Sequence, residues 1–280
     1  PLRLADLLVF DVDSEMFPEK VIWASAEPYK HIPSFGMSGD KLYKPMYIAP
    51  SYMPYTQTVV FVDPSGRGSD ETAVCVASTV NGYIIIHELI GLDGGYDEPT
   101  LEKICKKALE YGASEIRVES NFGDGTVAAL LRPVAVRVCG QIGVADYRVH
   151  GMKEKRMIEN IEPVMAAHRL VFNASTVRDE ETQKQITRLT EMKGALKHDD
   201  RVDVLSAACE YWKDFLQVDV DEMAAKNARK AEEDYVNMWV DDKRRGQLIS
   251  EGRGSGTSRV TTVFGGSGPT KKPNFLRRGR

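Results

Sequence analysis

The chain has 280 residues, of which 42% are hydrophobic and 28% charged, and its net charge is −4 at pH 7. This composition is normal for a globular protein with a sizeable core, and no apolar run approaches the ~18 residues that a membrane span requires. From Gln247 onward seven basic residues accompany one acidic residue, which leaves a net charge of −10 on the rest of the chain. Any proposed function must therefore account for the uneven charge, which is negative before Gln247 and positive in the glycine-rich tail that follows.

Residues 1–56 predict an extended arm or linker. Six prolines between Pro18 and Pro54 interrupt this stretch, and each removes a backbone donor and restricts the residue before it. Long helices are therefore not expected here. The chain begins Pro-Leu-Arg without an initiator Met, and we expect it to be a segment of a longer polypeptide.

A different pattern begins at Thr58, where β-branched and aromatic residues predict three strands at 59–62, 72–78 and 83–90. The Asn81-Gly82 dipeptide between the last two is a strong hairpin signal, so we expect antiparallel pairing. Apolar periodicity then predicts the following elements, in chain order: a helix over 98–111, a strand over 116–119, a short helix over 126–131, a strand over 134–138, and helices over 153–168, 178–191 and 202–215. Pro163 predicts a kink or break in its helix. This order predicts a mixed α/β sheet with helices on its faces.

Acidic residues fall where this order brings elements together. Asp63 ends the first strand of the sheet, Glu119 ends the strand after the first helix, and Asp200 and Asp203 open a late helix with a shared face. Clustered carboxylates repel one another unless a divalent cation neutralises them. Two such ions roughly 3.5–4 Å apart can activate a water and stabilise the leaving oxygen of a phosphodiester. The pattern thus predicts metal-dependent phosphodiester hydrolysis.

Four segments carry a resemblance to a known family, and they lie within residues 58–216. They are Val62-Asp63-Pro64-Ser65-Gly66-x-Gly-x-Asp70, Val118-Glu119-Ser120-Asn121, Lys153-Glu154-x-Arg156-Met157-Ile158 with Glu162-Pro163, and His198-Asp199-Asp200-Arg201-Val202-Asp203. The chain resembles the nuclease domain of tailed-bacteriophage terminase large subunits. The resemblance implies a ribonuclease H-like fold, with helices on both faces of a mixed sheet. It also implies an endonuclease that cuts concatemeric viral double-stranded DNA during genome packaging.

The same resemblance implies an organisation in four parts. Residues 1–56 would link to an upstream ATPase motor, because the chain contains no Gly-x-x-x-x-Gly-Lys-Ser/Thr phosphate loop. Residues 57–217 would form the nuclease domain, 218–246 a charged helical extension and 247–280 a flexible, disordered basic tail. The implied partners are double-stranded DNA, the terminase small subunit, the capsid portal and the upstream ATPase domain. We expect the host cytoplasm as the location, with transient attachment to the procapsid and no membrane.

The resemblance also implies roles for individual residues. Asp63 and Glu119 would ligate Mg²⁺ or Mn²⁺, with two ions expected. Asp203 is our choice for the third ligand, and Asp200 is the alternative or a ligand to the second ion. Asp70 would assist as an outer carboxylate. The basic residues expected to contact DNA are Lys153, Lys155 and Arg156.

Simpler interpretations remain open for these residues. Asp63 can cap a turn, and Asp199 or Asp200 can serve as a helix N-cap. The basic residues of the 153–168 helix can form a solvated face. Two other functions also compete: a Holliday-junction resolvase or transposase-like nuclease of the same fold, and a catalytically silent DNA- or portal-binding module. The four cysteines lie far apart without zinc-ligand spacing, which predicts free thiols and agrees with a cytoplasmic location.

Overall fold

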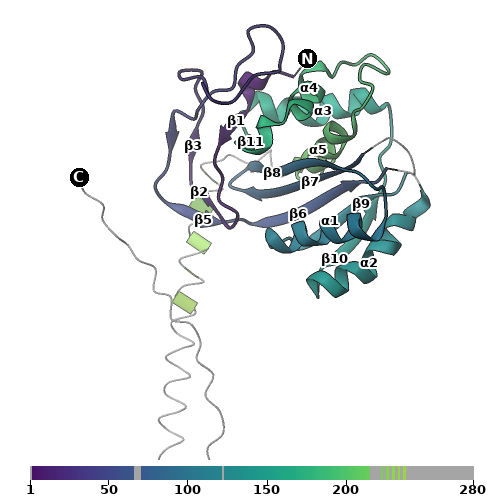
Figure 1. Cartoon of the computed structure of the whole chain (residues 1–280). Helices are drawn as coiled ribbons and strands as arrows, with labels where there is room; N and C mark the ends of the chain where they lie inside the picture. The colour runs from purple at the N-terminus through teal and green to yellow at the C-terminus, as the bar shows by residue number, and fades with distance from the viewer. Residues whose placement is uncertain are drawn as a thin grey trace, which may run out of the picture. The chain divides into compact units, whose positions relative to one another are not determined.

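A seven-stranded mixed sheet organises the unit Pro1–Arg229 (Figure 1). The computed structural model describes residues 2–65, 71–121, 123–214 and isolated positions up to 237. In spatial order the strands are β1 (Leu8–Phe10), β11 (Leu170–Asn173), β8 (Tyr83–Leu92), β7 (Thr72–Val80), β6 (Gln57–Asp63), β9 (Glu115–Glu119) and β10 (Gly143–Tyr147).

The three central strands confirm the predicted antiparallel pairing of β6 with β7 and of β7 with β8. Asn81 and Gly82 join the last two with φ values of 51° and 75°. Both residues therefore have the positive φ that a two-residue type I′ hairpin requires. Helix α1 (Glu98–Glu110) then returns the chain so that β9 pairs parallel to β6, and α2 (Thr126–Cys139) does the same for β10 beside β9.

Helices cover both faces of the sheet, as predicted (Figure 1). Val60 and Val62 of β6 pack with α1 and α2, whereas Val59 and Phe61 pack on the opposite face, because successive side chains of a strand alternate. That opposite face is covered by α3 (Lys153–Ala166), α4 (Glu180–Arg188) and α5 (Asp200–Tyr211).

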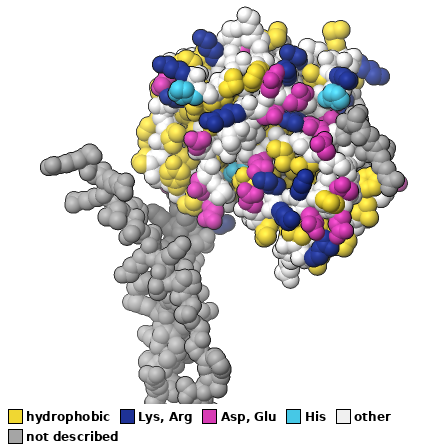
Figure 2. Space-filling view, in the orientation of Figure 1, with side chains coloured by type: hydrophobic (Ala, Val, Ile, Leu, Met, Phe, Trp, Pro, Cys, Tyr) yellow, Lys and Arg dark blue, Asp and Glu magenta, His cyan; other side chains and the backbone are white. Residues whose placement is uncertain are grey.

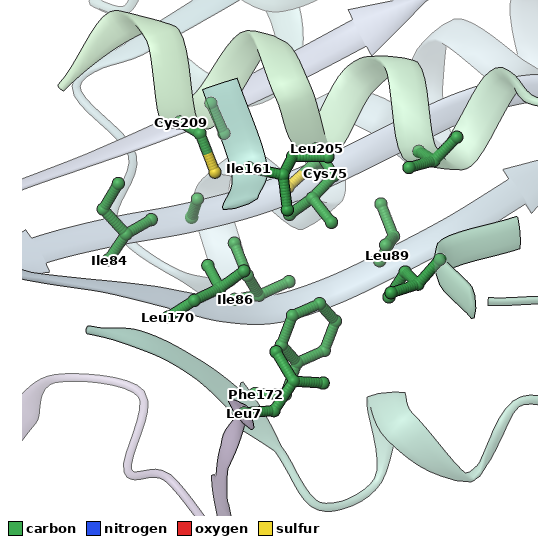
Figure 3. Close-up of a cluster of buried hydrophobic side chains, with 14 of the residues drawn as sticks. Leu7, Cys75, Ile84, Ile86, Leu89, Ile161, Leu170, Phe172, Leu205 and Cys209 are labelled. Atoms are coloured by element: carbon green, nitrogen blue, oxygen red, sulfur yellow. The ribbon is translucent and has the colours of Figure 1, made fainter. Parts of the chain in front are cut away.

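The position of α5 is set by its packing on the sheet. Leu205 and Cys209 of α5 lie over Cys75 of β7 and Ile84 and Ile86 of β8 (Figure 3). All five side chains are at most 1% exposed. Full burial of one such aliphatic side chain contributes about 1.5–3 kcal/mol, so sliding or rotating the helix is costly. The first turn of α5 is held in place in consequence.

The predicted strand over residues 134–138 is wrong, since these residues form the second half of α2. Val134, Val136 and Val138 alternate like a strand, but Ala128, Leu131 and Ala135 reach the core at helical spacing. The strand that follows is β10, at Gly143–Tyr147. The break predicted at Pro163 is also absent, because α3 continues through it to Ala166 and ends within its next turn.

Residues 1–56 are more regular than predicted. Leu8–Phe10 forms the edge strand β1, paired parallel with β11. Two small antiparallel pairs also form, namely β2 (Met16–Pro18) with β5 (Tyr52–Pro54) and β3 (Val21–Ile22) with β4 (Tyr47–Ile48). Strands of two or three residues are too short to show a repeating pattern in the sequence. The arm therefore contributes directly to the main sheet.

The extension predicted over 218–246 lies outside the described residues except at isolated positions, and the tail over 247–280 lies wholly outside them. All four cysteines are free thiols, as predicted. No helix in the described part of the chain combines the length and apolarity needed to cross a membrane.

Candidate metal centre

Three carboxylates from three elements meet at one edge of the sheet. Asp63 ends β6 and Glu119 ends β9, and the parallel register that pairs Val62 with Val118 brings the two acids side by side. Alternation along each strand directs both toward the face covered by α5, whose first turn contributes Asp203. Oxygens of the three carboxylates lie within 4.8 Å of one another.

The N-terminus of α5 is capped by a side chain from a neighbouring helix. Gln185 of α4 accepts hydrogen bonds from the backbone N–H groups of Arg201 at 3.1 Å and Val202 at 3.2 Å. Asp199 occupies the N-cap position, but its side chain makes no capping bond there. The alternative in which Asp199 or Asp200 is the N-cap therefore holds for the position of Asp199 and not for its side chain. Its carboxylate accepts instead from Lys153 of α3 at 2.8 Å.

Two basic side chains of α3 hold Asp203. The Arg156 guanidinium donates through Nη2 to Asp203 at 2.7 Å, and the Lys153 ammonium lies 3.2 Å from the other carboxylate oxygen. The Asp203 and Arg156 side chains are 4% and 11% exposed, which makes this a buried ion pair, whereas Lys153 is 40% exposed. The α3 cations thus stand beside the carboxylates and offset part of their charge.

The remaining two carboxylates are short of positive charge. Burial, followed by the charges of Glu119 and Asp203, raises the pKa of Asp63 well above its usual range. Burial and Asp203 also raise the pKa of Glu119, although Arg156 and Lys153 oppose the shift. Burial lowers the pKa of Lys153, but Asp203 and Asp199 outweigh it and the net shift is upward. A cation among these oxygens would relieve the repulsion between them.

The donor set suits a hard divalent cation. Mg²⁺ and Mn²⁺ prefer oxygen ligands and use few carboxylates alongside water and phosphate oxygens. Asp63, Glu119 and Asp203 supply such ligands, and no histidine or cysteine belongs to this group. Asp200 is also in the first turn of α5, where its charge contributes to the raised pKa of Asp63 but its carboxylate is outside the group of three.

The three basic residues expected to contact DNA do not form one patch. Lys153 and Arg156 face the carboxylates, whereas Lys155 is exposed and lies 3.6 Å from Glu159 one turn along α3. Of the three, Lys155 alone lies on the solvent-exposed side of α3. Asp70, the expected outer carboxylate, lies outside the described residues.

Sequence reasoning missed the role of Arg201, which fixes the first turn of α5 from outside. Its guanidinium binds both oxygens of Glu71 at 2.6 and 2.9 Å and reaches Asp179 at 2.5 Å. Two parallel bonds to one carboxylate fix orientation as well as distance. The sequence could have indicated this role, because Arg201 lies inside the Asp200-Arg201-Val202-Asp203 motif and a buried, charged helix turn needs counter-ions.

The chain is similar to known terminase proteins. The model of the family described as "Terminase Bacteriophage T7, Ribonuclease H-like domain" matches residues 62–170. The large terminase subunit of enterobacteria phage T3 is 33% identical over 243 residues. This alignment covers 81% of the chain but only 41% of the phage T3 protein, so the chain spans less than half of that relative.

Solved structures of terminase nucleases are also similar to the chain. That of the large terminase nuclease from thermophilic phage G20c is 14% identical, with a TM-score of 0.44, over 74% of this chain and 95% of that one. The Mn-soaked human cytomegalovirus terminase nuclease domain is 17% identical, with a TM-score of 0.43, over 56% and 83% of the two chains.

The chain contains a ribonuclease H-like domain, as shown by the mixed sheet with helices on both faces and by the family match. More specifically, the chain carries the nuclease domain of a phage terminase large subunit.

Proposed function

We propose that the chain is a divalent-metal-dependent endonuclease that cuts concatemeric viral double-stranded DNA during genome packaging. The observation that carries the proposal is the meeting of Asp63, Glu119 and Asp203 within 4.8 Å at the ends of two parallel strands. The phage T3 relative is a terminase large subunit, which supports packaging as the biological setting.

In this proposal Asp63, Glu119 and Asp203 hold Mg²⁺ or Mn²⁺, with a second ion shared with Asp200. Such ions lower the pKa of a bound water and stabilise the leaving oxygen of a phosphodiester. Lys153 and Arg156 set the local charge, because they already neutralise Asp203 and leave Asp63 and Glu119 undercompensated. The cation therefore binds most strongly on the side of the cluster formed by the strand ends.

Contacts with DNA are proposed to be local rather than spread over the surface. Acidic and basic side chains are intermixed on the face shown in Figure 2, so that face presents no broad positive field. Lys155 of α3 is exposed beside the helix turns that hold Lys153 and Arg156, and it is our choice for a phosphate contact. Further partners remain proposals: an upstream ATPase domain, the terminase small subunit and the capsid portal. The host cytoplasm and the procapsid are the proposed locations.

Cleavage of supercoiled plasmid with Mg²⁺ or Mn²⁺ tests this function. We expect wild-type protein to nick and linearise the plasmid, and Asp63→Asn and Glu119→Gln to reduce cutting by at least 100-fold. Asp146→Asn is the matched control, because Asp146 is an exposed carboxylate of β10 that pairs with Arg132 at 3.6 Å and is outside the cluster.

A four-way DNA junction in the same assay separates the alternatives. Preference for the junction over duplex plasmid would favour a resolvase. Binding of DNA without any metal-dependent cutting would favour a silent module. Near wild-type cutting by Asp63→Asn would show that the metal centre is assigned wrongly.

A further inference from the structure

Two buried hydrogen-bond donors at the metal centre have no acceptor. Within the described part of the chain, three buried side-chain polar atoms lack a hydrogen-bond partner, and two of them are the Tyr147 hydroxyl and Nη1 of Arg156. Buried polar groups are nearly always paired, because an unpaired one forfeits its bonds with water. Two such groups at one site point to an acceptor that arrives with a ligand.

Both donors come from elements that border the carboxylates. Tyr147 ends β10, where the parallel register pairs it with Glu119 of β9. Burial, then the charges of Glu119, Asp63 and Asp203, raise the pKa of the Tyr147 hydroxyl well above its usual range, and Arg156 opposes the shift. A phenol is protonated at neutral pH, so the Tyr147 hydroxyl can donate a hydrogen bond to an incoming acceptor. Arg156 binds Asp203 through Nη2, which leaves Nη1 as its second donor at the site.

We propose that the Tyr147 hydroxyl and Nη1 of Arg156 form a binding site for a phosphate oxygen beside the carboxylate cluster. The inference rests on the proposed function and specifies which residues receive the scissile phosphate. A guanidinium nitrogen and a neutral hydroxyl suit an anionic oxygen, since donors to an oxyanion form strong, charge-assisted bonds. A fixed donor aimed at a phosphoryl oxygen stabilises the charge that builds up there during hydrolysis.

Tyr147→Phe tests the site, because it removes the hydroxyl and keeps the ring. Tyr211→Phe is the matched control. The two rings lie on the same guanidinium, with Arg117 at 5.8 Å from the Tyr147 centroid and 4.7 Å from that of Tyr211. The Tyr211 hydroxyl already has partners, Gln57 at 3.2 Å and Glu115 at 3.3 Å. Arg156→Lys is a second variant that retains a cation for Asp203 and lacks the second guanidinium nitrogen.

Three measurements give the expected result. Tyr147→Phe should lower the single-turnover cleavage rate of a DNA duplex with Mn²⁺ on the order of 100-fold, and Tyr211→Phe by less than about 3-fold. Mn²⁺ affinity without DNA, measured from the EPR signal of free Mn²⁺, should stay within about 2-fold for Tyr147→Phe. Its melting temperature in EDTA should equal or exceed that of wild type, because the lost hydroxyl has no partner to lose.

Two outcomes would overturn the proposal. A matching fall in Mn²⁺ affinity would assign the hydroxyl to the shell of the cation, and an unchanged cleavage rate would leave it without a role in the reaction. If wild-type protein itself neither binds Mn²⁺ nor cuts DNA, the proposed function fails, and this result is distinct from a failure confined to Tyr147→Phe.

Discussion

Removing the charge from Asp63 and from Asp203 should change stability in opposite directions, although their carboxylates belong to one cluster. Burial and the neighbouring acids raise the pKa of Asp63, so ionising its carboxyl lowers the stability of the metal-free protein. Because the folded pKa is above the unfolded one, wild-type stability in EDTA falls as pH rises through the interval between them. Asp63→Asn removes this loss and should increase the free energy of unfolding at pH 7.

Asp203 is different because its charge is already paired. Its side chain is 4% exposed and lies 2.7 Å from Arg156, which is 11% exposed. Breaking a buried pair by removing one partner costs about 3–5 kcal/mol, since the other charge stays buried. Lys153 adds little because it is 40% exposed and keeps Asp199. Asparagine retains an acceptor for Arg156, so the lower end applies, about 3 kcal/mol.

Urea unfolding in EDTA at pH 7 measures both effects. A loss of that size corresponds to a melting temperature lower by roughly 6–12 °C for a domain of this length. Asp146→Asn, on the exposed side of β10, should stay within about 0.5 kcal/mol of wild type. With Mn²⁺ at 100 times its dissociation constant, wild type should gain about 2.7 kcal/mol and both cluster variants should lose that gain.

An Asp203→Asn protein as stable as wild type, or an Asp63→Asn protein less stable than wild type, would contradict these expectations. The first result would mean that Arg156 finds another acceptor. The second would mean that Asp63 is already neutralised within the fold. The bond from Arg156 is the reason that Asp203→Asn is expected to lose stability whereas Asp63→Asn is not.

Two further predictions concern residues away from the carboxylates. Burial lowers the pKa of His87 to about 4, so unfolding free energy should rise by roughly 3 kcal/mol between pH 4 and 6.5 in wild type. His87→Gln should flatten that rise in urea titrations at each pH, and an equal slope in both proteins would contradict the assignment. Lys155→Ala should lower the slope of log binding constant against log salt for duplex DNA by about 0.9, if Lys155 makes one phosphate contact. Lys106→Ala, an exposed lysine of α1 paired with Glu102, is its control and should leave the slope unchanged.

The strand-end acids were predictable because strands follow a simple rule. A run of β-branched residues marks β6 and β9, alternation gives the face, and adjacency of central strands brings Asp63 and Glu119 together. The same rule predicted a strand wrongly at Val134–Val138, where valines alternate inside helix α2. It missed β1 and β11 because a three- or four-residue apolar run has no period to detect.

The choice between Asp200 and Asp203 could not be made from periodicity, because α5 is buried on nearly every side. Each residue from Val202 to Cys209 is buried, so the helix has no exposed polar face. The sequence therefore does not show which side of the helix faces the sheet. Its rotation is decided by partners elsewhere in the chain: Gln185 caps its first turn, and Glu71 binds Arg201. Leu205 and Cys209 then pack on the sheet. An acid inside such a helix is tolerated only where a counter-ion reaches it. Arg156 lies 47 residues earlier and reaches Asp203, so the counter-ion of Asp203 comes from a segment that periodicity within α5 cannot reveal.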